Sequence, residues 1–242
     1  MEYLFYFLMT FGLATLFSMT GAGAGIAVIP ILHFLGFPFD LSKATGLFVG
    51  FSTTVTSSLM NWRRGVLQIR RFLPLALTLP LFAPLGAQLS RHVDPHWVKL
   101  LFALFLIFSA GMMLFFRKKP RMHLTGWWVM TLLGAGVGTL AGLLGVGGGN
   151  LLLPLLILLG FPAKEVAVAV SFVVPFSSLS SFLSYASFVP LDIPLLLSCA
   201  AGAVLGGVAG NTLLHSRLRP EDIRKVIAGI LVLLALRLLW NL

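Results

Sequence analysis

The chain has 242 residues, of which 58% are hydrophobic and only 10% are charged, and its formal net charge is +10. A soluble domain carries about 25% charged residues, so this composition excludes an ordinary water-soluble protein and predicts a chain surrounded by lipid. No soluble domain remains to bind nucleic acid, so we expect no nucleic-acid partner and a lipid bilayer instead.

Eight apolar blocks have the length of about 20 residues that a helix needs to cross a hydrocarbon core of about 30 Å. Two shorter blocks, 26–37 and 150–161, follow glycine-rich stretches and, at about 18 Å, are too short to cross alone. The sequence therefore predicts an all-α polytopic membrane protein with about eight long transmembrane helices and two short, interrupted or half-spanning helices. The long blocks occupy roughly residues 3–20, 44–61, 72–90, 97–116, 125–144, 166–186, 191–214 and 223–240.

The first apolar block also has a feature of a signal peptide, because GAGAG at 21–25 resembles a small-residue cleavage site. It lacks a basic n-region, however, and the motif recurs in mid-chain as GVGGG at 145–149. We therefore expect the first block to be a membrane helix.

The second half of the chain repeats the first half after a shift of 124 residues. Without any gap, 13 of 41 positions are identical between 21–61 and 145–185. Both segments read G-x-G-x-G, four residues, Pro, five residues and Gly-Phe-Pro. We predict two copies of one unit, 1–116 and 125–242, joined by a basic cytoplasmic linker at 117–124.

The basic residues predict that the two copies are inverted relative to each other. If all ten segments carry the chain across the membrane, 13 of the 17 basic residues lie on one side. If the short segments re-enter instead, this bias weakens, so the positive-inside rule favours the first arrangement. With five segments per copy, the copies are antiparallel and both termini face away from the cytoplasm.

The two glycine runs are the candidate substrate site. Inverted repeats are common in secondary transporters, whose sites lie where interrupted helices of the two halves meet near the midplane. A glycine turn at a helix start exposes N–H groups and the positive end of the helix dipole, which suits a small anion. All seven acidic residues lie in loops or at segment ends, which argues against a cation site. The candidate substrate-binding glycines are Gly21, Gly23, Gly25, Gly145, Gly147, Gly148 and Gly149.

Close helix packing is the alternative role for glycine in a membrane protein. A four-residue spacing places glycines on one helix face, whereas the spacing of two in the runs distributes them around a helix. We therefore assign the runs to a site and the four-residue sets to packing. The packing glycines are Gly134, Gly138, Gly142, Gly202, Gly206 and Gly210.

Several polar residues close to the glycines are further candidates for substrate binding. Asn150 follows the second run and either donates to an oxyanion or caps the next helix. Two hydroxyl runs contain Thr53, Thr54, Ser177 and Ser178. These hydroxyls either line the path of the substrate or bond back to the preceding helical turn.

Three ionisable residues complete the candidates. His33 stands alone in a short segment and is either a proton-coupling group or a hydrogen-bonded structural histidine. Arg63 and Arg64 could attract anions to the cytoplasmic mouth, although the orientation signal already explains them.

The duplicated motif resembles the sulfite exporter TauE/SafE family. The resemblance covers essentially the whole chain and is clearest in GAGAGIAVIPILHFLGFP and GVGGGNLLLPLLILLGFP. It implies a multi-pass transporter in the bacterial inner membrane that exports sulfite or an organosulfonate such as sulfoacetate, with protons as a candidate coupling ion. One departure is Ala24 in the first copy where the second has Gly148, so the two glycine runs are chemically unequal.

Two other functions are alternatives to transport. A membrane-embedded enzyme would need a nucleophile with a base, or a metal cluster. The sequence has no G-x-S-x-G, His-Glu pair or Cys/His cluster, so we expect no catalytic residues, metal or cofactor. A membrane subunit without transport activity of its own would be expected to carry soluble docking segments, which the sequence does not contain.

Overall fold

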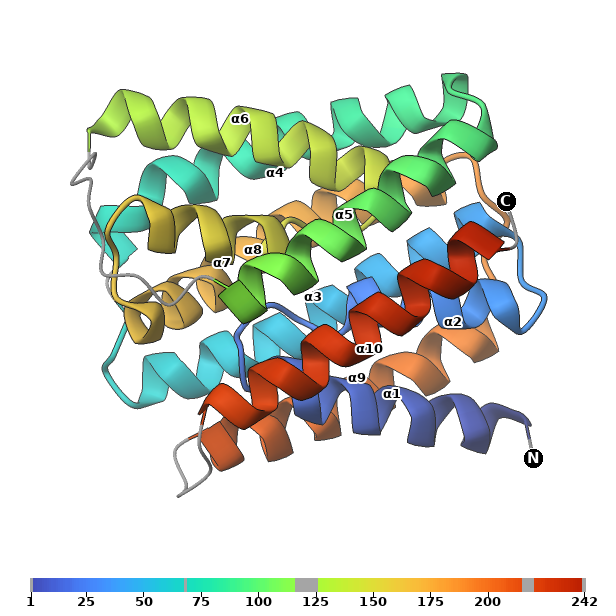
Figure 1. Cartoon of the computed structure of the whole chain (residues 1–242), viewed down its shortest axis with the longest axis horizontal. Coiled ribbons are helices and arrows are strands. Elements are labelled where there is room, and N and C mark those ends of the chain that lie inside the picture. The colour runs from blue at the N-terminus through green and yellow to red at the C-terminus, as the bar shows by residue number, and fades with distance from the viewer. Residues whose placement is uncertain (1, 68, 116–125, 215–219, 241–242) are drawn as a thin grey trace.

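The computed structural model of the chain describes residues 2–67, 69–115, 126–214 and 220–240, which are all-helical apart from turns and contain no strand (Figure 1). The linker predicted at 117–124 lies outside these residues. The helices are α1 (Glu2–Ser18), α2 (Gly25–Phe34), α3 (Phe39–Arg63), α4 (Ile69–His92), α5 (Pro95–Phe115), α6 (Trp127–Leu144), α7 (Gly149–Leu158), α8 (Ala163–Ala186), α9 (Ile193–Leu214) and α10 (Pro220–Trp240).

Within the described residues, five helices are long and apolar enough to cross a membrane, namely α4, α5, α6, α8 and α9. Helices α1, α2 and α7 are apolar but shorter. Helix α3 has 25 residues, but Asp40, Lys43 and its many hydroxyls lower its hydropathy. The prediction of an all-α, polytopic membrane protein is confirmed, and five of the eight predicted long spans meet this test of length and composition.

The two short helices have 10 residues each, which corresponds to about 15 Å. Both end at a glycine in the left-handed region, Gly36 with φ 97° and Gly160 with φ 105°. The N–H of Phe37 then donates to the carbonyl of Leu32 at 3.2 Å, as expected for a glycine C-cap. A proline follows each of these two glycines in the sequence and prevents the helix from continuing.

The two halves of the chain are interleaved. The most extensive helix contacts join α4 to α6, α1 to α9, α4 to α8, α3 to α8 and α5 to α10. Each pair takes one helix from the first half and one from the second, and Figure 1 shows α5 and α10 lying across the face towards the viewer. The core of the molecule therefore lies between the halves.

Glycine faces allow the closest of these contacts. A Cβ atom on Gly138 would lie 2.8 Å from the carbonyl oxygen of Leu79 in α4, and Gly134 and Gly142 also contact α4. The glycines of α9, at the same four-residue spacing, lie against the backbone or hydroxyl groups of α1. The packing role predicted for these six glycines is confirmed.

Both termini lie at the same end of the helix bundle, on the right in Figure 1. At the opposite end, α3, α5, α7 and α9 finish and the helices that follow them begin. Helices α2 and α7 start near the middle of the bundle and run towards opposite ends. This arrangement places the start of each short helix in the interior.

Candidate functional site

The two glycine runs form buried turns in front of α2 and α7, which we call the first glycine turn (21–25) and the second glycine turn (145–149). The turns contact each other, because a Cβ on Gly149 would lie 2.6 Å from the carbonyl oxygen of Ala22. Five of the predicted glycines have φ angles from 69° to 85°, which residues with side chains rarely adopt. These are Gly21, Gly23, Gly145, Gly147 and Gly148.

The surroundings of the two turns differ at matching positions. A Cβ on Gly23 would lie 3.0 Å from the methyl carbon Cγ2 of Thr54. A Cβ on Gly147, the matching residue, would collide with the hydroxyl oxygen of Ser178. The second turn therefore faces a hydroxyl oxygen where the first faces a methyl group.

The four candidate hydroxyl groups have different partners. Those of Thr53 and Thr54 donate to carbonyl groups one turn earlier in α3, at 2.8 and 2.6 Å. Ser177 donates to the carbonyl of Gly147 at 2.7 Å and so supports the second glycine turn. The buried hydroxyl of Ser178 has no protein partner. Of these four residues, only Ser178 has a hydroxyl that is left for a ligand beside the turn.

Asn150 does not cap α7. The N-cap residue is Gly148, which makes no side-chain cap bond, and both polar atoms of the Asn150 amide are buried without a protein partner. Asn150 and Ser109 line a cavity of about 20 Å³, and the hydroxyl of Ser109 is likewise without a partner. A space of this size with polar walls suits one water molecule or one oxygen atom of an anion.

The three ionisable candidates lie outside the glycine turns. The Nδ1 atom of His33 donates to the carbonyl of Phe37 at 3.1 Å. Arg63 and Arg64 are exposed at the end of α3, about 20 Å along the helix from Gly50. Arg64 donates to the side-chain oxygen of Asn211 in α9 at 2.6 Å. The structure thus brings the glycine turns and Ser178 together, whereas the Asn150 amide lines the small cavity beside Ser109 and these three residues lie elsewhere.

A buried lysine that the sequence analysis did not select lies beside the second turn. The side chain of Lys43 is 1% exposed, and its Nζ lies 2.6 Å from an Asp40 carboxylate oxygen and donates to Ser90 at 2.7 Å. The ring centroids of Phe39 and Tyr185 each lie 5.0 Å from Nζ. The sequence signal for this cluster is the spacing of three between Asp40 and Lys43, which pairs them on one helix face.

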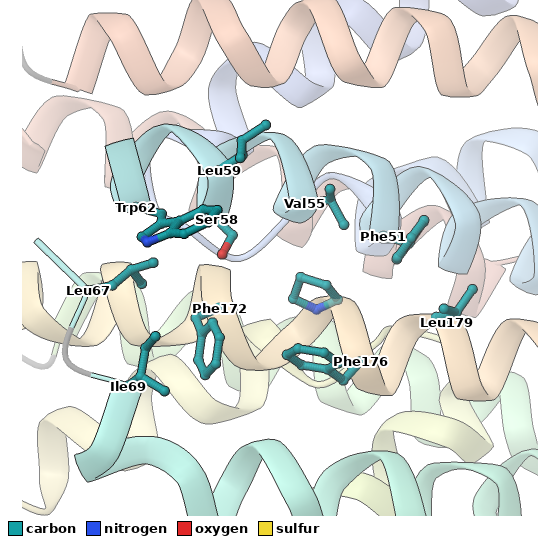
Figure 2. Close-up of a pocket in the computed structure, with 11 residues that line it drawn as sticks. Phe51, Val55, Ser58, Leu59, Trp62, Leu67, Ile69, Phe172, Phe176 and Leu179 are labelled. Carbon is teal, nitrogen blue, oxygen red and sulfur yellow. The ribbon is translucent and has the colours of Figure 1, made fainter. Parts of the chain in front are cut away.

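Two larger cavities differ in their lining. An apolar groove of about 430 Å³ lies between α3, α8 and the start of α4 (Figure 2). It is lined by apolar and aromatic side chains such as Phe51, Trp62 and Phe176, with Ser58 as the hydroxyl residue. No charged residue lines this groove among the described residues, so it suits lipid acyl chains better than an anion.

The second cavity, which we call the outer cavity, has a volume of about 300 Å³ and is rich in charge. It lies where α2 and α4 end and α3 and α5 begin, at the end of the bundle that holds both termini (Figure 1). Its ionisable lining residues are His33, Asp40, Lys43, Arg91 and Lys99.

Apolar helices of spanning length, packed around two buried glycine turns, define the class of multi-pass membrane proteins. The sequence profile of the family described as Sulfite exporter TauE/SafE matches residues 6–238, so the chain belongs to this family. The resemblance seen in the glycine motifs is confirmed.

Two relatives are named as transporters. The chain is 26% identical to the probable membrane transporter protein MJ0441 of Methanocaldococcus jannaschii, over 92% of this chain and 90% of that protein. It is 24% identical to the probable membrane transporter protein YunE of Bacillus subtilis, over 94% and 93% of the two chains. The similarity therefore extends over almost the full length of both relatives and agrees with a transporter rather than an enzyme.

Proposed function

We propose that the protein is a secondary transporter that exports a small sulfur-containing anion, sulfite or an organosulfonate such as sulfoacetate. The observation that supports this most is the contact between the two buried glycine turns, Gly149 against Ala22. The first N–H groups of a helix have no partner within the helix, and the helix dipole is positive there. Two such helix starts that meet in the interior of the bundle offer partial positive charge to an anion.

The proposal includes two inverted repeats, 1–116 and 125–242, with eight long spans and two half-spanning helices. The helix lengths support it, because α1 to α5 have 17, 10, 25, 24 and 21 residues. Helices α6 to α10 follow with 18, 10, 24, 22 and 21 residues. Opposite chain directions of α1 and α6 in Figure 1 also agree with inversion. The membrane is the bacterial inner membrane, with both termini away from the cytoplasm.

In this mechanism, main-chain N–H groups of the glycine turns, the Ser178 hydroxyl and the Asn150 amide donate to the oxygens of the anion. His33 is the candidate for proton coupling, and Arg63 and Arg64 attract the anion at the cytoplasmic mouth. The buried, mutually packed turns correspond to an occluded state, which rocking of one repeat against the other opens to either side.

Flux in proteoliposomes tests the function. We expect the purified protein to transport sulfite or sulfoacetate in preference to sulfate, and a proton gradient to change the rate if protons are coupled. Thiosulfate serves as a further comparison. Absence of flux for every sulfur-containing anion would refute the proposed substrate class.

The variant Gly147→Ala tests the site, because the added Cβ would collide with the Ser178 hydroxyl oxygen beside the turn. We expect flux to be lost. The matched control is Gly65→Ala, because Gly65 has φ 68° against 69° for Gly147 but faces open space. Both variants bear a similar backbone cost of about 1–3 kcal/mol, and only one obstructs the turn. Wild-type flux in a monodisperse Gly147→Ala protein would refute the site.

A further inference from the structure

The glycine turns alone do not explain why a lysine is buried next to them. We propose that Lys43 is an anion-binding residue at the connection between the outer cavity and the second glycine turn. In this proposal, Asp40 holds the Lys43 ammonium group until an anion replaces the carboxylate. The inference rests on the proposed function, since it places a second contact on the path of the same anion.

The position of Lys43 links the two sites. Its side chain lines the outer cavity. Its aliphatic stem covers the second glycine turn, because a Cβ on Gly145 would lie 2.7 Å from the Cβ and 2.8 Å from the Cγ of Lys43. A single side chain therefore contacts both the cavity and the glycine turn. An anion that moved from one to the other would pass the ammonium group.

Of the two polar partners of the Lys43 ammonium group, the Asp40 carboxylate is the one that an anion can replace. A buried ammonium group is unfavourable unless polar or negative partners replace its water. Lys43 is 1% exposed, whereas Asp40 is 50% exposed and can remain hydrated when it leaves the ion pair. Ser90 is buried, and its hydroxyl remains as a partner of the ammonium group. An oxyanion that enters from the cavity can therefore replace the carboxylate without leaving a buried charge unpaired.

The outer cavity favours anions electrostatically. Its lining carries the cations Lys43, Arg91 and Lys99 against one carboxylate, Asp40. Lys99 lies over the Phe39 ring at 5.7 Å, and Arg91 also lies over an aromatic ring at 5.7 Å. Aromatic faces hold a cation without neutralising its charge. A recess with excess positive charge raises the local concentration of anions.

The lysine is present in only one copy of the repeat. The position 124 residues after Lys43 is Ala167, whose backbone contacts Gly21 as the Lys43 stem contacts Gly145. The cationic contact therefore belongs to the end of the bundle that holds the termini. A compact ammonium group suits a small oxyanion that carries its charge on several oxygens.

Anion binding to the purified full-length protein in detergent tests the inference, with sulfite and sulfoacetate as titrants in isothermal calorimetry. We expect Lys43→Met to weaken binding by roughly tenfold or more, because a charge-assisted hydrogen bond to the anion is lost. We expect Asp40→Asn to tighten binding, because the competing carboxylate is gone. The control Lys164→Met removes an exposed charge at the start of α8 and should leave binding unchanged.

The outcomes separate the inference from the proposed function. A purely structural ion pair predicts that Asp40→Asn lowers the unfolding temperature and leaves binding unchanged or weaker, which would overturn the inference. Equal binding by wild-type and folded Lys43→Met protein would also overturn it, while wild-type flux would leave the proposed function standing. If Lys43→Met does not fold, the Asp40→Asn result decides alone. A wild-type protein that neither binds nor transports these anions would refute both.

Discussion

The hydroxyl group of Ser178 is buried, has no protein partner and lies against Gly147. Burying an unpaired hydroxyl costs about 1–3 kcal/mol, and a ligand oxygen that bonds to it would recover that cost. We expect Ser178→Ala to lower the affinity for the transported anion and to keep or raise the unfolding temperature. Calorimetric anion titration and thermal unfolding measure the two effects.

Ser177→Ala is the matched control, because that hydroxyl already donates to the carbonyl of Gly147 at 2.7 Å. Loss of this hydrogen bond should lower the free energy of unfolding by about 1 kcal/mol. It should not remove a donor to the substrate, because the Ser177 hydroxyl is already used. Full anion affinity in the Ser178→Ala protein would exclude Ser178 from the site.

Two features of the candidate site could not be predicted from the sequence. Lys43 is one of the four basic residues outside the more basic side, so the distribution of charge along the chain does not single it out. Its contact with Gly145, 102 positions later in the chain (145 minus 43), is set by helix packing and has no local sequence signature. The same holds for the unpaired hydroxyl of Ser178, since Ser177 and Ser180 in the same helix donate to carbonyl groups one turn earlier.

Helix α6 contacts α4 through glycines on only one of its faces. A Cβ on Gly138 would lie 2.8 Å from the Leu79 carbonyl oxygen, whereas Gly136, two residues earlier, has no atom within 4 Å. We expect Gly138→Ala to destabilise the protein by about 1–3 kcal/mol through overpacking. Gly136→Ala should be neutral or slightly stabilising, because alanine favours helix over glycine. Equal unfolding temperatures of the two variants in detergent would contradict this packing.

The short helices were predictable at their starts and less so at their ends. The blocks 26–37 and 150–161 were expected, and the helices begin one residue earlier, at Gly25 and Gly149. They end three residues earlier than expected, because the glycine of Gly-Phe-Pro adopts a positive φ and stops the helix. Hydropathy counts the phenylalanine as part of an apolar block, whereas the backbone conformation decides where the helix ends.

For the whole molecule, the proposed orientation has a direct test. Cys199 is buried, so introduced cysteines can be labelled on a Cys199→Ala background. Ser187 and Lys164 are exposed near opposite ends of α8. We expect an impermeant maleimide to label Ser187→Cys in intact cells and Lys164→Cys only after the inner membrane is opened. Labelling of both from outside would contradict a membrane crossing by α8, and the reverse pattern would contradict the proposed orientation.

Helices of the first half pack most closely against helices of the second half, and this has a consequence for biosynthesis. Helices α1 and α4 are made early, but the helices that cover them, α9 and α6, are made late. While the ribosome is still translating the second half, the first half lies in the bilayer without its tightest neighbours. Assembly is therefore a late, whole-chain event, and a product truncated after the first half would present uncovered helix faces to the proteases of membrane quality control.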